Sequence, residues 1–312
     1  MVEVAENATV AAAADIGSNA TKILLWEIAG DGRARERFQK RYPLRLDDVF
    51  RTGQIEPATI ARLIETFLDI ADIVRKNGAR QVRAVATEAF RSASNARAVV
   101  EAIALETGIE PEVISPQEEG RLVASGVLLD HPEQRNSFMI LDIGGGSAQI
   151  TRPIRDGAIR TTSVPLGAVR LREMFIHSDP IRPADFGAMS EHVEATLRRG
   201  ATGIEYRGSG GAFGCGGGVR FLHTMCGILH GALSQDQAIR VAQVEHLRDA
   251  IWAMTSDSLA RHYGIDHERA EIIVPGVVVL LGLMKHLKIR QLQPSSRGVR
   301  DGLLAEFMKS ER

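Results

Sequence analysis

The sequence predicts an α/β fold with two domains, and three observations carry that prediction. The chain has 312 residues, which is long for one hydrophobic core and suits two domains of about 150 residues each. Patterns typical of strands alternate with patterns typical of helices along both halves, as in α/β proteins. A short motif occurs once in each half, as Asp15-Ile16-Gly17 and Asp142-Ile143-Gly144. We therefore expect two domains related by duplication.

Each motif begins the same local pattern. Small or apolar residues precede it, and an apolar or alternating run follows it at residues 23–28 and 148–154. Each run then meets an Asp-Gly pair, Asp31-Gly32 or Asp156-Gly157, which is typical of the turn in a β-hairpin. The sequence therefore predicts two equivalent β-hairpins.

The elements between the motifs alternate in type. Pro57 begins a helical pattern of apolar residues that Asn77-Gly78 ends. Ser115-Pro116-Gln117-Glu118 has the pattern of a capping box with proline at the first helical position, so a helix begins there. In a capping box the Glu118 carboxylate accepts from the Ser115 amide. We also expect a strand over 82–87, a helix over 95–106 and a short strand at 113–114.

Beyond the second motif, helices predominate in the sequence pattern. Apolar periodicity predicts helices over 169–175 and 183–198, and a long amphipathic helix with one break within 235–262. The segment 208–218 is too rich in glycine for the interior of a strand, so we expect its backbone to pass close to another group.

The composition is that of an ordinary soluble protein. Hydrophobic residues make up 44% and charged residues 25%, with a net charge of −1, which indicates neither disorder nor a nucleic-acid partner. Glu3 and Glu6 stand where a secretory signal needs positive charge. The most apolar stretch, 272–283, contains Pro275 and is too short to span a bilayer. We expect a cytoplasmic protein without membrane segments, in which Cys215 and Cys226 are structural thiols.

The repeated motif suits phosphate binding. A glycine at the end of a strand lets the backbone approach a ligand, and the amides of the following turn point at a shared anion. A plain tight hairpin is the alternative for either copy alone, but two copies at equivalent positions favour binding. The candidate phosphate-binding residues are Asp15, Gly17, Ser18, Asn19 and Lys22 in the first half, and Gly144, Gly145, Gly146, Ser147, Gly216 and Gly217 in the second.

Asp15 and Asp142 each end a predicted strand without an evident cationic neighbour in the local sequence. A carboxylate beside a phosphate is repelled unless a divalent cation lies between them. We therefore infer Mg²⁺ or a similar hard cation that bridges the substrate and Asp142. The alternative is that each aspartate caps the amides of its own turn.

Glu119 and Arg91 are candidate catalytic residues. Glu119 follows the predicted helix start and is available as a general base if Glu118 caps the helix. Arg91 follows a predicted strand, where its guanidinium can clamp a phosphate bidentately. The alternatives are a solvated surface glutamate and a surface ion pair. Arg45 is a weaker candidate for the clamp.

Other phosphate-binding motifs do not fit segment 208–218. It lacks the Gly-Lys-Ser/Thr of a Walker A loop and the spacing of a dinucleotide-binding loop. Four residues separate Cys215 from Arg220, whereas the loop of cysteine phosphatases has five. Neither a Walker-type ATPase nor a cysteine phosphatase is therefore expected.

These residues together resemble the exopolyphosphatase and guanosine pentaphosphate phosphohydrolase family, of the actin/Hsp70/sugar-kinase superfamily. The resemblance covers nearly the whole chain, and its motifs keep their order and spacing. The motifs are Asp15-Ile16-Gly17-Ser18-Asn19, Ala86-Thr87-Glu88-Ala89-Phe90-Arg91, Val113-Ile114-Ser115 with Glu118-Glu119-Gly120-Arg121-Leu122, Leu141-Asp142-Ile143-Gly144-Gly145-Gly146-Ser147, Pro165-Leu166-Gly167-Ala168-Val169-Arg170-Leu171, the glycine-rich segment, and Gly298-Val299-Arg300-Asp301-Gly302-Leu303-Leu304.

The resemblance implies two RNase H-like domains, the actin-like ATPase fold, on either side of a cleft. They would comprise residues 1–125, completed by a C-terminal helix at 300–312, and residues 126–299. The resemblance also implies that Glu119 is the general base that activates water, that Mg²⁺ acts near Asp142, and that members are commonly homodimers. Asp142 and Glu119 are our candidate metal ligands.

The activity that the resemblance implies is hydrolysis of phosphoanhydride bonds. We expect an exopolyphosphatase that releases orthophosphate from inorganic polyphosphate, with 5′-phosphohydrolysis of pppGpp as the alternative. Longer family members carry extra C-terminal helical domains that are absent here, so we expect a less processive enzyme that favours shorter chains.

Three positions depart from the family pattern. Gln149 and Asp301 stand where Glu is usual, and Gly218 stands where Thr or Ser is common; metal affinity and substrate preference are the properties these departures affect. Gln149 also leaves open a non-catalytic regulator that binds phosphate or nucleotide, although Glu119 and Arg91 are both retained. A kinase of the same superfamily is a further alternative, but such kinases usually use an aspartate as the base.

Overall fold

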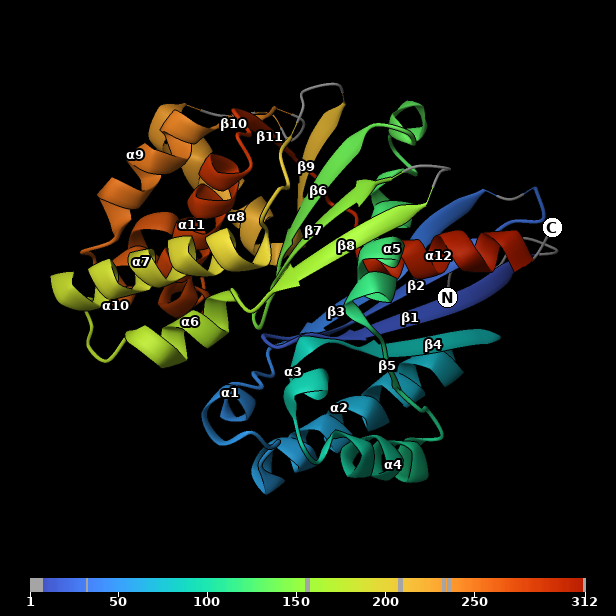
Figure 1. The fold of residues 1–312 in the computed structure, drawn as a ribbon. Coiled ribbons are helices and arrows are strands. Elements are labelled where there is room, and N and C mark those ends of the chain that lie inside the picture. Colours follow the sequence, from blue (N-terminus) through green and yellow to red (C-terminus); the bar gives the residue numbers. More distant parts are fainter. Residues whose placement is uncertain are drawn as a thin grey trace. The chain divides into compact units, whose positions relative to one another are not determined.

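A computed structural model of the chain describes residues 8–31, 33–154, 158–206, 210–231, 234 and 237–310, with the side chains of 309 and 310 excepted. The predicted α/β class is confirmed, because two mixed sheets are each flanked by helices (Figure 1). Contacts between Cα atoms divide the chain into two compact units. Unit 1 comprises Met1–Leu129 with Gly298–Arg312, and unit 2 comprises Asp130–Arg297.

Unit 1 is built on a sheet whose described strands follow the order β3-β2-β1-β4-β5. The first strand pairs antiparallel with the second and parallel with the fourth. The elements are β1 (Thr9–Ile16), β2 (Thr21–Ile28), β3 (Ala34–Tyr42), α1 (Asp48–Thr52), α2 (Pro57–Lys76), β4 (Gln81–Ala86), α3 (Glu88–Ser92), α4 (Ala96–Thr107), β5 (Glu112–Val113), α5 (Pro116–Val127) and α12 (Val299–Ser310).

Helices cover both faces of this sheet. Figure 1 shows α2 and α4 along one face, and α5 with α12 along the other. Strand β1 is buried over nearly its whole length because it is central and covered on both sides, which explains its run of alanines. Helix α2 begins with Pro57 and buries Leu63, Phe67 and Ile70, as its apolar periodicity predicts.

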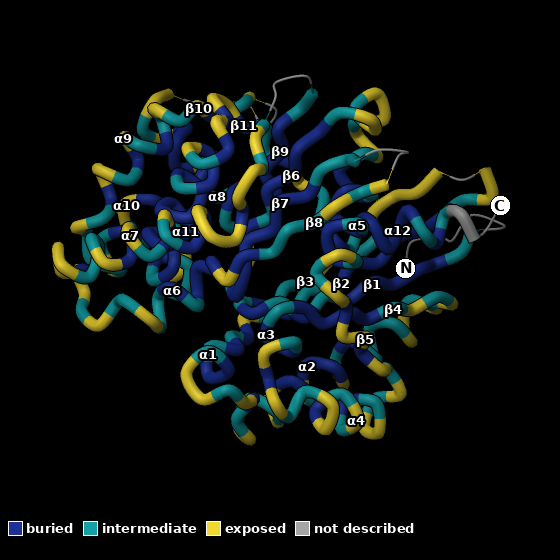
Figure 2. The backbone as a smooth tube through the Cα atoms, viewed as in Figure 1, coloured by how far each residue is buried: buried dark blue, intermediate teal, exposed yellow. Residues whose placement is uncertain are grey.

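Unit 2 is built on a sheet whose described strands follow the order β10-β11-β9-β6-β7-β8. Figure 2 shows β6, β7 and β9 as buried, with exposed residues concentrated at the helix surfaces. The elements are η1 (Pro132–Gln134), β6 (Phe138–Ile143), β7 (Ala148–Pro153), β8 (Ile159–Val164), α6 (Ala168–Phe175), α7 (Pro183–Gly200), β9 (Gly211–Cys215), α8 (Gly216–His230), β10 (Ile239–Arg240), α9 (Val241–Ile251), α10 (Ser256–Tyr263), α11 (His267–His286) and β11 (Gln291–Pro294).

The strand orders show that the repeat extends beyond the motif. The order β3-β2-β1-β4-β5 in unit 1 corresponds to β8-β7-β6-β9-β11 in unit 2. In both units the strand that ends in Asp-Ile pairs antiparallel with the next strand and parallel with a later one. Both predicted hairpins are confirmed by the β2–β3 and β7–β8 pairings. Gly32 and the pair Asp156-Gly157, which we expected in their turns, lie outside the described residues.

The glycine-rich segment corrects one prediction. Residues Gly211–Cys215 form β9, a strand inside the sheet between β6 and β11, although we expected too much glycine for a strand. The reason is steric: a Cβ added at Gly214 would lie 2.5 Å from Leu292 and 2.6 Å from Val219. The expected close approach is confirmed, since a Cβ at Gly210 would lie 1.8 Å from the Ser137 carbonyl oxygen.

The helical predictions in unit 2 are largely confirmed. Helices α6 and α7 occupy the expected ranges. Helices α9 and α10 are separated by residues 252–255, which matches the one break expected within 235–262. Pro275 lies inside α11 without ending it, and this helix is buried on nearly all sides. Within the described residues, no helix is long and apolar enough to cross a membrane. Cys215 and Cys226 are buried free thiols.

Candidate active site

The first loop of the repeat joins β1 to β2 in unit 1. It is closed by a hydrogen bond from the Gly17 amide to the Ala20 carbonyl, 3.2 Å. The Ser18 carbonyl accepts from the Leu46 amide at 3.0 Å, which attaches the loop to the segment that contains Arg45. Asn19 Oδ1 is buried and has no hydrogen-bond partner among the described residues. This oxygen is therefore available to a ligand that donates a hydrogen bond or carries a cation.

Asp15 has cationic neighbours, contrary to our expectation. Lys22 lies opposite Asp15 in the β1–β2 register, and Arg300 reaches the same region from α12, where its guanidinium donates to the Ile23 carbonyl at 3.4 Å. Burial raises the pKa of the Asp15 carboxyl, and the charges of Lys22 and Arg300 oppose that rise. The sequence did not reveal these neighbours, because one is cross-strand and the other lies far along the chain.

Arg91 and Glu119, the two candidate catalytic residues, form an ion pair in unit 1. Arg91 Nη1 lies 2.9 Å from Glu119 Oε2 and also donates to the Ile114 carbonyl at 2.8 Å. The other side of the guanidinium contacts Glu88 Oε2 at 3.0 Å. The side chains of Arg91 and Glu119 are only 15% and 10% exposed. The alternative of a solvated glutamate is therefore wrong. The alternative of an ion pair at Arg91 is present, but the pair is largely buried.

Helix α5 carries Glu119 in its first turns, and its start is as predicted. Ser115 caps the helix by accepting from the Glu118 amide at 3.1 Å, and Pro116 is the first helical residue. The predicted role of the Glu118 side chain is wrong, however. Its carboxylate instead accepts two bonds from Arg121, at 2.7 and 2.8 Å, and these bonds lower the pKa of Glu118.

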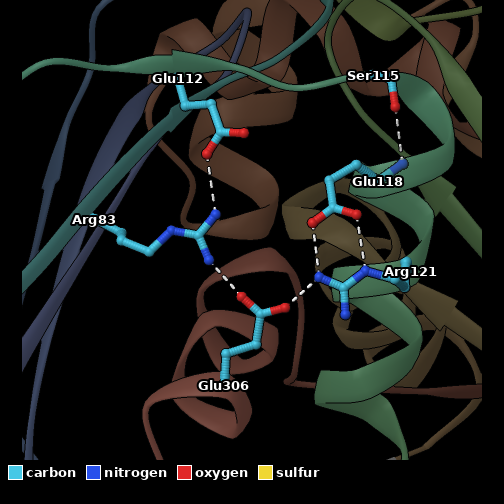
Figure 3. A network of polar contacts seen from close by, with 6 residues as sticks. All are labelled: Arg83, Glu112, Ser115, Glu118, Arg121 and Glu306. Carbon is cyan, nitrogen blue, oxygen red and sulfur yellow. Dashed lines mark hydrogen bonds and ion pairs between the residues drawn. The ribbon is translucent and has the colours of Figure 1, made fainter. Parts of the chain in front are cut away.

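A charged network surrounds this part of α5 (Figure 3). Glu306 from α12 is placed between Arg121 of α5 and Arg83 of β4 and pairs with both. Arg83 also pairs with Glu112 of β5 at 3.0 Å. The two helices are in direct backbone contact as well, since a Cβ at Gly302 would lie 2.0 Å from the Leu122 carbonyl oxygen. The helix that carries Glu119 is therefore fixed on several sides.

The second loop joins β6 to β7 in unit 2 and has the same closing bond, from the Gly144 amide to the Ser147 carbonyl at 3.0 Å. The start of α6 holds the carbonyls of this loop. The Gly144 carbonyl accepts from the Ala168 amide at 3.1 Å, and the Gly145 carbonyl accepts from Val169 and Arg170 at 2.9 and 3.0 Å. The Arg170 side chain donates to the Gly146 carbonyl at 2.8 Å. The loop is thus fixed entirely through its backbone.

Asp142 lies against the start of α8. Its register partner on β9 is Cys215, and Gly216 follows with φ of +86°. A Cβ on Gly216 would lie 2.8 Å from both Asp142 Oδ1 and the Ile143 carbonyl oxygen, so only glycine fits there. Gly217 by contrast faces open space. Unit 2 thus brings together the Asp142 carboxylate, Gly216 and the second loop of the repeat, residues 144–147, which is called the glycine loop below.

The donor chemistry of these residues fits Mg²⁺. The described residues contain no group of three or more His, Cys, Asp or Glu side chains that would form a protein-only metal site. Mg²⁺ does not need one, because it is usually held by one or two carboxylates together with waters and substrate phosphates. Asp142 in unit 2 and Glu119 in unit 1 are carboxylates of the required type.

Of the three positions that depart from the family pattern, Gln149 and Asp301 are buried. Gln149 is 2% exposed and is the register partner of Asp142. Asp301 accepts from the Gly298 amide at 2.9 Å and thereby caps α12. A Cβ on Gly218 would lie 3.8 Å from the Ile143 carbonyl oxygen, which leaves room for a larger residue.

Our prediction of site residues missed Gly167, Arg170 and Arg300. A Cβ at Gly167 would lie 2.1 Å from the Gly145 carbonyl oxygen, so this glycine permits the contact between α6 and the second loop. The available signal was their place in the Pro165–Leu171 and Gly298–Leu304 motifs of the sequence.

Comparison with known proteins agrees with this geometry. Exopolyphosphatase 1 of Mycobacterium tuberculosis is 26% identical over 302 residues, which is 95% of this chain and 88% of the relative. The guanosine-5′-triphosphate,3′-diphosphate pyrophosphatase of Pseudoalteromonas atlantica is 28% identical over 96% of this chain and 58% of its own length. The crystal structure of an exopolyphosphatase from Cytophaga hutchinsonii superposes with a TM-score of 0.86 at 22% identity, over 97% of this chain and 98% of that one.

The family model for Ppx/GppA phosphatases matches residues 36–311. This match covers Arg91, Glu119, the second loop of the repeat and the start of α6, whereas β1, β2 and the first loop precede it. The chain belongs to the Ppx/GppA phosphatase family, whose members named above hydrolyse phosphoanhydride bonds.

Proposed function

We propose that this protein is a metal-dependent exopolyphosphatase that removes the terminal orthophosphate from inorganic polyphosphate. The observation that carries the proposal is the buried pair of Arg91 and Glu119, 2.9 Å apart, at the start of α5. A carboxylate held away from bulk solvent beside a phosphate-binding type of cation is the arrangement that general-base hydrolysis of a phosphoanhydride needs.

The proposed step is an in-line attack by water on the terminal phosphorus. Glu119 accepts a proton from the water as its oxygen bonds to phosphorus, and the P–O bond to the rest of the chain breaks. The shortened chain leaves with its oxygen negatively charged. Arg91 is placed to neutralise the phosphoryl oxygens, for which its guanidinium exchanges part of its contact with Glu119 and Glu88 for the phosphate.

The two loops of the repeat are the proposed phosphate grips. In the first loop Ser18 and Asn19 supply donors, with Lys22 opposite Asp15. The Gly17 amide closes the loop, and the absence of a side chain at Gly17 lets the ligand approach the backbone. In the second loop the α6 contacts occupy the carbonyls of Gly144–Gly146, which leaves backbone amides and Ser147 for an anion. Gly216 and Gly217 at the start of α8 extend this grip. In unit 2, Asp142 would hold Mg²⁺, which supplies positive charge to the phosphoryl oxygens when bound.

Hydrolysis of pppGpp to ppGpp is the second candidate function. The observation that favours it is the 28% identity with the pyrophosphatase of Pseudoalteromonas atlantica. The same Glu119 chemistry serves both substrates, because the bond that breaks is a phosphoanhydride in each. The match covers 88% of the Mycobacterium tuberculosis exopolyphosphatase but only 58% of the Pseudoalteromonas atlantica pyrophosphatase. We therefore place polyphosphate first.

The deciding experiment measures orthophosphate release from polyphosphates of graded length and from pppGpp, with Mg²⁺ present. We expect the higher kcat/KM on polyphosphate. Glu119→Gln should lower kcat by about 10²–10⁴-fold, the usual contribution of a general base. Glu106→Gln is the matched control, because Glu106 is an exposed carboxylate on α4 of the same unit.

Absence of release from either substrate would end the enzyme proposal. Activity that survives Glu119→Gln would instead remove the mechanism and leave the activity. A higher kcat/KM on pppGpp would reverse the order of the two candidates. A cytoplasmic homodimer stays a prediction, and light scattering of the purified protein checks its dimeric part.

A further inference from the structure

Unit 2 contains an open pocket of about 540 Å³ that is separate from the glycine loop. It is lined by residues at the start of α9, the end of α11 and the segment before β11. Four of these residues are basic, Arg240, Lys285, Lys288 and Arg290, and the others are apolar. The lining contains no aspartate or glutamate. A concave surface with cations from three elements and no anion is typical of an anion-binding site.

The two arginines are the cations that a ligand would engage most directly. Lys285 pairs with Glu245 at 2.6 Å and Lys288 pairs with Glu205 at 2.7 Å. Neither Arg240 nor Arg290 has an ion pair with a carboxylate in the described part of the chain. The backbones of the two arginine segments are joined, because the Val241 amide donates to the Arg290 carbonyl at 3.1 Å. Arg240 and Arg290 therefore belong to neighbouring backbone segments that line the same pocket, and a bound anion offsets the repulsion between their like charges.

Lys288 adds a backbone observation at the same place. It has φ of +59°, and it is the one residue other than glycine with positive φ among those described. It follows the C-terminus of α11, where the Ile289 amide donates to the Met284 carbonyl at 2.8 Å, and glycine is the usual residue at such a position. A lysine there costs stability relative to glycine and keeps a positive charge on the rim of the pocket.

The pocket and the glycine loop lie at opposite ends of the same sheet. Strand β11 runs parallel to β9, with Pro294 opposite Gly214. Arg290 precedes β11, whereas Gly216 follows β9, so about six residues of strand separate the two levels. At about 3.3 Å per residue, this separation is about 20 Å along the strands. A single phosphate cannot contact both places, but a chain of several phosphates has the length required.

We propose that Arg240, Arg290, Lys285 and Lys288 form a second anion-binding site that takes oligophosphates. This inference rests on the proposed function only for the choice of phosphate compounds as the ligand; the site itself follows from the pocket and its charges. The oligophosphate has two possible sources, which share their chemistry: the distal part of the chain whose end is being hydrolysed, or a free phosphorylated molecule. Arginine suits both, because its planar fork pairs bidentately with phosphate oxygens.

The test measures binding in the full chain with Glu119→Gln present, so that turnover does not consume the ligand. The probes are a polyphosphate of medium length, tripolyphosphate, and a single-stranded DNA oligomer of similar total charge, each titrated by calorimetry. The test variant is Arg240→Gln with Arg290→Gln. The matched control is Arg182→Gln with Arg198→Gln, which removes the same charge from two exposed positions of the same unit, the N-cap of α7 and its last turn.

We expect the test pair to weaken polyphosphate binding at least about tenfold, the factor that corresponds to loss of one charge-assisted contact. The control pair should change it by less than about twofold. If the distal chain is the source, tripolyphosphate binding is unchanged. If a free ligand is the source, the stoichiometry of tripolyphosphate falls by one site. Either result supports the second site.

Three outcomes overturn the proposal: unchanged polyphosphate affinity in the test pair, an equal loss in the control pair, or an equal loss of DNA binding. Lys288→Gly guards against misfolding as an explanation, because glycine suits the positive φ. This variant should keep or raise the melting temperature while it weakens polyphosphate binding. Phosphate release by the wild-type chain is measured separately, so failure of the proposed function and failure of this site remain distinct.

Discussion

The two loops of the repeat share a closing bond but differ in what holds them. Gly17 donates to Ala20 in the first loop, and Gly144 donates to Ser147 in the second, at 3.2 and 3.0 Å. The first loop presents the polar side chains of Ser18 and Asn19. The second loop presents glycines, and three amides and one guanidinium from α6 bind its carbonyls.

This difference indicates how each loop achieves its order. Glycine loses more conformational freedom on folding than any other residue, so a glycine loop needs contacts from outside to fix it. The α6 contacts provide them in unit 2. The first loop has side chains that occupy defined positions, and the Leu46 amide adds one backbone contact. We therefore expect substitutions near the second loop to act through backbone geometry and substitutions near the first to act through charge.

Gly167→Ala should have the largest effect, because the new Cβ would lie 2.1 Å from the Gly145 carbonyl oxygen, which cannot move without losing its bonds to α6. We expect the free energy of unfolding to fall by about 1–3 kcal/mol, as in other overpacked sites, and phosphate release to be nearly lost. Urea denaturation and a release assay measure the two effects. Gly187→Ala on α7 is the control, since no atom lies within 4 Å of its Cβ; a similar loss there would contradict the steric explanation.

Asp142→Asn and Asp15→Asn should separate the two aspartates of the repeat by metal dependence. If Asp142 holds Mg²⁺, its amide variant needs at least about tenfold more Mg²⁺ for half-maximal phosphate release, the loss expected for one charge-assisted contact. Asp15→Asn should leave the Mg²⁺ concentration for half-maximal phosphate release unchanged. Binding of Mn²⁺ to each variant, followed by electron paramagnetic resonance, gives the same comparison without turnover. An equal shift in both variants would contradict the assignment of the metal to Asp142.

Lys22→Met should weaken substrate binding at the first loop with a smaller effect. Lys22 lies opposite Asp15 and keeps its apolar stem in methionine. We expect KM for tripolyphosphate to rise by about tenfold, because one charged contact to phosphate is lost, while kcat changes little. Steady-state kinetics measures both constants. A fall in kcat at unchanged KM would place Lys22 at the reacting phosphate instead.

Asp15→Asn should have the smallest effect and the clearest pH dependence. Burial raises the pKa of Asp15, so the ionised carboxylate lowers the stability of the folded state as pH rises through the folded pKa. The variant should therefore be more stable than wild type at neutral pH, by on the order of 1 kcal/mol. The difference should vanish below the ordinary aspartate pKa of about 3.9. Urea denaturation over a pH series measures it, and a difference that persists at low pH would point to lost packing.

Local sequence patterns predicted the elements whose signals are local. The Ser115-Pro116 cap located α5, Pro57 located α2, and the repeated Asp-Ile-Gly located both hairpins. Patterns failed where packing decides the structure. Strand β9 contains glycines because Leu292 and Val219 leave no room for side chains, and no local propensity contains that information.

In the candidate site too, local sequence patterns predicted which residues matter, but not the contacts that these residues make. Glu119 and Arg91 were identified by residue type and position, but their contact joins residues 28 positions apart and required the β5–α5 turn to bring them together. The assignment of Glu118 to the capping box failed because Arg121, three residues later on the same helix face, offers a charged partner. Arg300 reaches Asp15 from the other end of the chain, so a local motif could not predict it.

The contact between α12 and α5 has a consequence for synthesis of the chain. Unit 1 consists of residues up to Leu129 and of a segment that begins at Gly298. On the ribosome, domains generally fold in the order in which they emerge. Here the continuous unit 2 is complete before Glu306 and Gly302 are available to α5. The N-terminal unit is therefore finished last, and a chain that stops short of α12 would leave the helix that carries Glu119 without its neighbour.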